Sequence, residues 1–162
     1  MKPSTQEWLS RAKDDLDVAE KIQDCPHLTN MVAFHAQQVI EKSFKAELEE
    51  TNQDIPKLHN LVRLHYLVKD TLGLEIDDLR LKEISDVYTD TRYPREIGLL
   101  PDVKPAIEDA ARFFQFAQQI YQHILKRFSE TDIAAHEEHA SKLSDDSKSA
   151  QTDDNEKLEK LA

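Results

Sequence analysis

The chain has 162 residues, 33% charged and 39% hydrophobic, with a formal net charge of −11, which is the size of about one acidic domain. Its two glycines are too few for the glycine-rich loops of dinucleotide or P-loop sites, and no stretch approaches the roughly 20 apolar residues of a membrane span. The single cysteine, Cys25, excludes an intramolecular disulfide and a cysteine-based zinc site, and it fits a cytoplasmic protein. An acidic chain is also a poor general binder of nucleic acid.

The negative charge is concentrated at the C-terminal end. Residues 129–162 contain ten acidic and four basic side chains, and the last aromatic residue is Phe128. Beyond it, residues 144–155 offer too little apolar surface to offset the entropy cost of ordering. We therefore predict a domain over residues 1–131 and an acidic, low-complexity tail over residues 132–162 that is disordered or partly helical.

Apolar residues in the domain recur at helical spacing, and no stretch alternates as a strand would. Ser4 and Glu7 have the spacing of a capping box and predict a first helix that ends before Cys25. A second helix is expected from about Thr29 to Glu50. Its predicted inward-facing residues are Ala33, Ala36, Ile40, Phe44 and Leu48.

A shorter third helix is expected from about Leu58 to Leu72, and Gly73 ends it. At its start, His59 or Asn60 either caps the helix or reaches the groove beside it. A fourth helix runs from about Asp77 to Asp90, with Leu81, Ile84 and Tyr88 on one side. Residues 91–101 form the longest loop of the domain.

The last helix has the clearest apolar stripe, and we expect Asp102 to cap it and Pro105 to lie in its first turn. The stripe consists of Val103, Ile107, Ala110, Phe114, Ala117, Tyr121, Ile124 and Phe128. Together the segments predict an all-α, up-and-down bundle of about five helices.

A row of polar residues on the second helix is unusual. Gln37, Glu41 and Lys45 are spaced by four, with Glu41 before Lys45, the favourable order for an ion pair. His35, Gln38 and Lys42 form a neighbouring row. Composition alone favours a solvated edge stabilised by i,i+4 pairs over a catalytic role.

The histidines do not predict a metal centre. None of the seven has a glutamate three positions before it, which excludes the usual di-metal pattern of helix bundles. His136 and His139 lie in the polar tail, where they offer at most a weak and nonspecific cation site. His65 lies on an apolar stripe and is expected to be a core or interface residue. We predict no metal site and no cofactor.

Residues 88–95 contain the remaining candidate chemistry. Arg92 and Arg95 lie near a helix end and flank Tyr93 and Pro94, an arrangement that suits a phosphate or an acidic partner. The alternative is structural: Arg92 pairs with Asp90 or Glu41 and holds the loop on the bundle. Spacing does not distinguish the two.

Four pieces of the sequence carry a family resemblance. They are Trp8 with Ala12–Leu16 and Ala19, Phe34–Gln38 with Glu41, Lys42, Lys45 and Ala46, His59–Leu61, and Thr91–Pro94. In this order they resemble the HEPN domain (higher eukaryotes and prokaryotes nucleotide-binding) over about residues 5–128. The resemblance implies an all-α bundle that forms homodimers, often partnered by a nucleotidyltransferase-fold protein in toxin–antitoxin pairs.

Many HEPN proteins are ribonucleases with an Arg-x4–6-His motif, in which histidine moves a proton and arginine stabilises charge on phosphorus. No arginine of this chain has a histidine at that spacing. Arg92 matches the position of the motif arginine, and a replacement for its histidine would have to come from elsewhere, for instance His59 or His35.

The resemblance and the missing motif together predict a non-catalytic, homodimeric HEPN protein with a nucleotidyltransferase-fold partner, and a nucleotide or RNA as a further ligand. The predicted binding residues are Arg92, Tyr93 and Arg95, followed by Lys45, His59 and Gln37. One alternative is a toxin ribonuclease with a non-standard site around Arg92. Another is an adaptor whose acidic tail engages a basic partner by charge steering.

Overall fold

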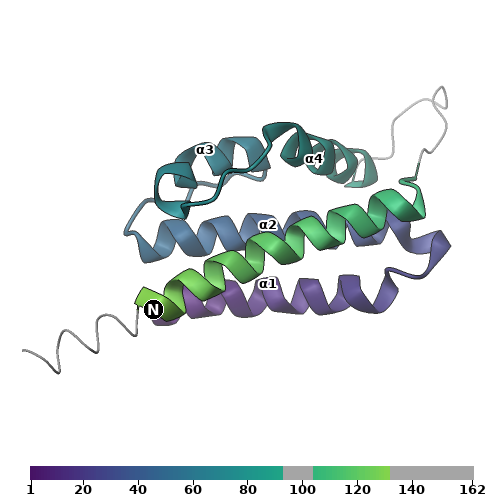
Figure 1. Cartoon of the computed structure of the whole chain (residues 1–162). Coiled ribbons are helices and arrows are strands. Elements are labelled where there is room, and N and C mark those ends of the chain that lie inside the picture. Colours follow the sequence, from purple (N-terminus) through teal and green to yellow (C-terminus); the bar gives the residue numbers. More distant parts are fainter. Residues whose placement is uncertain (93–103, 132–162) are drawn as a thin grey trace, which may run out of the picture. The chain divides into compact units, whose positions relative to one another are not determined.

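The computed structural model describes residues 1–92 and 104–131 (Figure 1). Its helices are α1 (Pro3–Ile22), the short 3-10 helix η1 (Pro26–Leu28), α2 (Thr29–Glu50), α3 (Leu61–Leu72), α4 (Asp78–Arg92) and a helix over residues 107–131. The described ranges contain no strand. The predicted all-α bundle is therefore confirmed.

Internal contacts divide the chain into two units, Met1–Lys126 and Arg127–Ala162. In the first unit, α2 lies centrally and packs against α1, α3 and α4 (Figure 1). The five residues expected to face inward on α2 are all fully buried. Complete burial of a side chain such as Phe44 contributes about 1.5–3 kcal/mol to folding, so this face secures α2 at the centre of the unit.

The first helix begins differently from the prediction. Pro3 opens α1 after Lys2, and no side chain caps its first turn. The capping-box interpretation of Ser4 is wrong, because its hydroxyl donates to Glu49 Oε1 of α2 over 2.6 Å. A contact between two helices thus replaces a local cap.

Both ends of α3 follow from local chemistry. Asn60 is the N-cap, and its Oδ1 accepts a hydrogen bond from the backbone N–H of Arg63 over 2.9 Å. The helix starts at Leu61, so Leu58 lies outside it. Gly73 ends it with φ +63°, a left-handed conformation that costs glycine little.

The last helix starts at residue 107, and Pro105 precedes it instead of lying in its first turn. Asp102 and Val103 lie outside the described residues. Ile107 is 37% exposed, whereas the stripe is buried from Ala110 onward. Burial raises the pKa of Tyr121 on this helix. Among charged residues of α1, Lys13 lowers this pKa and Asp17 raises it, and the net shift is upward.

His65 is a core histidine, as expected. It is 8% exposed, stacks on Phe44 with ring centroids 5.9 Å apart, and its Nδ1 lies 2.9 Å from Asp78 Oδ1. This contact joins α3 to the first turn of α4.

In the described part of the chain, no helix is both long enough and apolar enough to cross a membrane.

Candidate functional site

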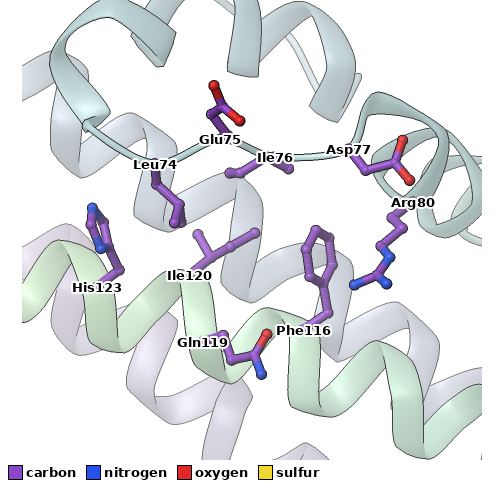
Figure 2. Close-up of a pocket in the computed structure, with 9 residues that line it drawn as sticks. All are labelled: Leu74, Glu75, Ile76, Asp77, Arg80, Phe116, Gln119, Ile120 and His123. Carbon is purple, nitrogen blue, oxygen red and sulfur yellow. The ribbon is translucent and has the colours of Figure 1, made fainter.

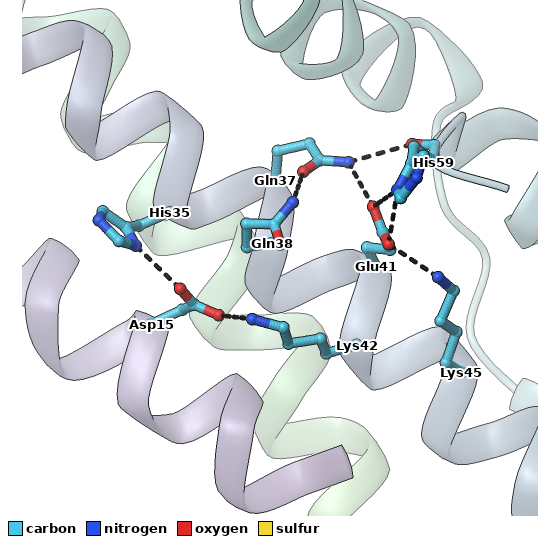
Figure 3. A network of polar contacts seen from close by, with 8 residues as sticks. All are labelled: Asp15, His35, Gln37, Gln38, Glu41, Lys42, Lys45 and His59. Carbon is cyan, nitrogen blue, oxygen red and sulfur yellow. Dashed lines mark hydrogen bonds and ion pairs between the residues drawn. The ribbon is translucent and has the colours of Figure 1, made fainter. Parts of the chain in front are cut away.

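Polar residues of α2 form two groups, shown in Figure 3. We call the first the Glu41 cluster; it consists of Gln37, Gln38, Glu41, Lys45 and His59. The second, the Asp15 cluster, consists of Asp15 of α1 with His35 and Lys42 of α2.

Glu41 is the centre of the first cluster. Its Oε1 lies 2.8 Å from Lys45 Nζ, and its Oε2 accepts a hydrogen bond from Gln37 Nε2 over 3.0 Å. His59 Nδ1 lies 3.0 and 3.2 Å from the two carboxylate oxygens. Three side chains therefore converge on one carboxylate.

The ion pair inside this cluster is buried. Only 6% of the Glu41 side chain and 8% of the Lys45 side chain are exposed. Gln37 is fully buried, and Lys45 Nζ also lies 5.6 Å from the ring centroid of Trp8. A buried pair is tolerated only when hydrogen bonds satisfy both charges, which these contacts do for Glu41.

His59 forms the accessible end of the cluster, in the connection that precedes α3. Its side chain is 58% exposed, and its backbone carbonyl accepts a hydrogen bond from Gln37 Nε2 over 3.0 Å. Because the Glu41 carboxylate can only accept, His59 Nδ1–H donates to it. This contact orients the imidazole and leaves Nε2 available to a ligand.

The Asp15 cluster joins α1 to α2. The Asp15 side chain is 13% exposed; its Oδ1 lies 2.9 Å from His35 Nδ1, and its Oδ2 accepts from Lys42 Nζ. Burial alone would raise the pKa of Asp15, but hydrogen bonds from His35 and Lys42 outweigh it and hold the pKa below its ordinary value. The cluster is an electrostatic link between two helices.

Three of the six predicted binding residues meet in one place: Gln37, Lys45 and His59. The expectation of a solvated edge is wrong for Gln37, Glu41 and Lys45, because the His59 segment and Trp8 lie against it. The central role of Glu41 was indicated only by its four-residue spacing. Tyr93 and Arg95, and the side chain of Arg92, lie outside the described residues, as do His136 and His139.

Within residues 1–92 and 104–131, no group of three or more His, Cys, Asp or Glu side chains has an arrangement that could hold a metal ion. The contacts seen in the Glu41 cluster are hydrogen bonds and an ion pair. The cluster presents one oriented imidazole above buried polar side chains.

The family model of the HEPN domain matches residues 5–127. A search of curated proteins gave no match. Among solved structures, TT1696 from Thermus thermophilus is similar, with 21% identity and a TM-score of 0.65 over 75% of this chain and 96% of that one. ST0689, described as an archaeal HEPN homologue, has 20% identity and a TM-score of 0.57 over 78% of this chain and 98% of its own. At these identities the structures support the fold alone.

Proposed function

Because this chain belongs to the HEPN domain family, we propose that it acts as a non-catalytic homodimer that binds a nucleotidyltransferase-fold protein, in a toxin–antitoxin-like pair, and a nucleotide. The family's Arg-x4–6-His sequence occurs nowhere in the chain. The observation that carries the proposal is the Glu41 cluster, which uses its buried charges in internal contacts and exposes an imidazole.

Rigidity is what suits this cluster to binding. Gln37, Lys45 and His59 all contact the same carboxylate, and a fully satisfied buried network holds its members in one arrangement. A side chain that is already ordered loses little entropy when a partner docks. We therefore assign partner contact to His59, and positioning to Glu41, Lys45 and Gln37.

The proposal also assigns Arg92, Tyr93 and Arg95 to the binding surface, because guanidinium groups recognise phosphates and carboxylates bidentately. For the homodimer contact we assign Tyr66 of α3 and Leu79 of α4. These apolar side chains are 70% and 74% exposed, and burying them in an interface would be favourable.

Sequencing the neighbouring gene, followed by calorimetry with its product if that product has the nucleotidyltransferase fold, tests the proposal. We expect saturable binding that His59→Ala weakens by about tenfold, the loss expected when one charge-assisted hydrogen bond is removed. His27→Ala is the matched control, because His27 is exposed and its only described hydrogen bond uses the backbone carbonyl. Absence of binding, or equal weakening by both variants, would refute the assignment.

A ribonuclease with a non-standard site is the second candidate, and the orientation of His59 is the observation that favours it. A carboxylate at Nδ1 leaves Nε2 as a base that can take a proton from a 2′-hydroxyl. Induction of the chain in cells, followed by growth and RNA-integrity measurements, tests this candidate. Toxicity that both His59→Ala and Arg92→Ala abolish would support it, and toxicity indifferent to both changes would eliminate it.

A further inference from the structure

A cavity separate from the Glu41 cluster lies between the connection from α3 to α4 and the helix over residues 107–131 (Figure 2). Its volume is about 430 Å³, within the usual range for small-molecule sites. All its lining residues belong to the unit Met1–Lys126. Neither the family match nor the structural neighbours assign a role to it.

The middle of the cavity is apolar. Leu74 and Ile76 line it from the α3–α4 connection, and Phe116 and Ile120 line it from the last helix. Ile120 is 1% exposed, whereas Phe116 is half-buried. Such walls favour the ring or hydrocarbon body of a ligand.

Arg80 marks one end of the cavity. Its guanidinium lies 5.8 Å from the centroid of the Phe116 ring, and within residues 1–92 and 104–131 it forms no ion pair with a carboxylate. Arg112 in the adjoining depression differs, because it pairs with Asp109 and Glu83. Arg80 is therefore the cationic side chain available to an anion here.

Two carboxylates, Glu75 and Asp77, also line the cavity, and within residues 1–92 and 104–131 neither forms an ion pair with Arg80. Figure 2 shows the Glu75 carboxylate pointing away from Phe116 and Ile120. Asp77 Oδ1 accepts a hydrogen bond from the backbone N–H of Leu79 over 2.9 Å and so caps α4. An anion beside Arg80 would meet the guanidinium, which binds carboxylates by charge-assisted hydrogen bonds.

His123 defines the opposite end. Its Nε2 lies 2.8 Å from the carbonyl oxygen of Leu72, and because a carbonyl only accepts, Nε2 carries the proton of that bond. In the neutral imidazole Nδ1 is then an acceptor. A ligand group that meets Nδ1 of the neutral ring donates to it, as a hydroxyl does.

We propose that this cavity binds a small aromatic acid that carries a hydroxyl group at the end opposite its carboxylate. The carboxylate pairs with Arg80, the ring packs against Phe116 and Ile120, and the hydroxyl donates to His123 Nδ1. Phe116 and His123 are seven residues apart on one helix, a rise of about 10 Å, and the ring of the ligand lies along this stretch.

Titration of the full chain with three related probes tests this assignment. The probes are 3-(4-hydroxyphenyl)propionate, 3-phenylpropionate, which lacks the hydroxyl, and 2-(4-hydroxyphenyl)ethylamine, which reverses the charge. We expect the hydroxy acid to bind about fivefold more tightly than 3-phenylpropionate and more than about tenfold more tightly than the amine, as expected for a neutral and a charged hydrogen bond.

Two arginine variants locate the site. Arg80→Gln should weaken binding of the hydroxy acid by about tenfold or more without lowering the melting temperature, because Arg80 is exposed. Arg63→Gln on α3 removes an exposed arginine outside the cavity and should change nothing. Three results would each overturn the proposal. The amine could bind as tightly as the acid, or Arg80→Gln could leave the affinity for the acid unchanged. The third result is that the acid does not saturate the chain at about 10 mM, a concentration above a dissociation constant of about 1 mM.

Discussion

Replacing Glu41 by glutamine removes one charge from a pair that is almost completely buried. The side chains of Glu41 and Lys45 are 6% and 8% exposed and lie 2.8 Å apart, so Glu41→Gln leaves an unpaired ammonium in a site closed to solvent. Breaking a buried pair from one side costs about 3–5 kcal/mol. That is a large share of the roughly 5–15 kcal/mol that holds a domain folded.

A double-mutant cycle separates this charge effect from the loss of packing. Lys45→Met should cost about 2 kcal/mol, less than Glu41→Gln, because Glu41 keeps its contacts with Gln37 and His59. The double variant leaves no unpaired ammonium. We therefore expect the double variant to lose less unfolding free energy than the two single variants lose together, by at least about 1.5 kcal/mol.

Urea denaturation followed by circular dichroism measures these free energies, provided the m-value is unchanged. The matched control is Asp86→Asn, because Lys82 and Asp86 have the same i,i+4 spacing but side chains that are 65% and 60% exposed. An exposed pair of this kind contributes less than about 0.5 kcal/mol. The reasoning fails if Glu41→Gln costs no more than Asp86→Asn, or if the two single losses simply add.

Three further predictions concern the helix ends and the Asp15 cluster. Asn60→Ala should lower the free energy of unfolding by about 1 kcal/mol because α3 loses its N-cap, and Asn60→Asp should not. Gly73→Ala should cost about 1 kcal/mol in the same urea assay: no atom lies within 4 Å of the added Cβ, so the loss comes from φ +63° alone. The folded pKa of Asp15 lies below its ordinary value, so its stabilisation is fully present well above that ordinary value and is lost as the pH falls through the folded pKa. Asp15→Asn should therefore lower the free energy of unfolding at neutral pH and make it fall less steeply below about pH 4. The same dependence of this free energy on acid pH in both proteins would contradict the prediction.

Helix positions were predictable from the sequence where one apolar face decides them. The bounds Thr29–Glu50 of α2 agree with the prediction, because residues repeating at helical spacing have only one way to face a common core. The start of the last helix was harder to place. Its apolar pattern extends back to Val103, but the helix begins at residue 107, and Ile107 is 37% exposed.

The candidate site was predictable in its pairs but not in its burial. Spacing identified Glu41 and Lys45 as partners because residues four apart are neighbours on any helix. Whether this edge of α2 is shielded from solvent depends on His59, which lies 18 positions after Glu41 and contacts it only in the tertiary fold. The bond from Ser4 to Glu49 joins residues 45 positions apart and was invisible to local reasoning for the same reason.

Light scattering of the chain, purified together with the product of the neighbouring gene, tests the central claim most directly. The account predicts a particle that contains both proteins, in which this chain, of 18.7 kDa, is present in two copies. A monomer of 18.7 kDa that elutes apart from a nucleotidyltransferase-fold neighbour would contradict it.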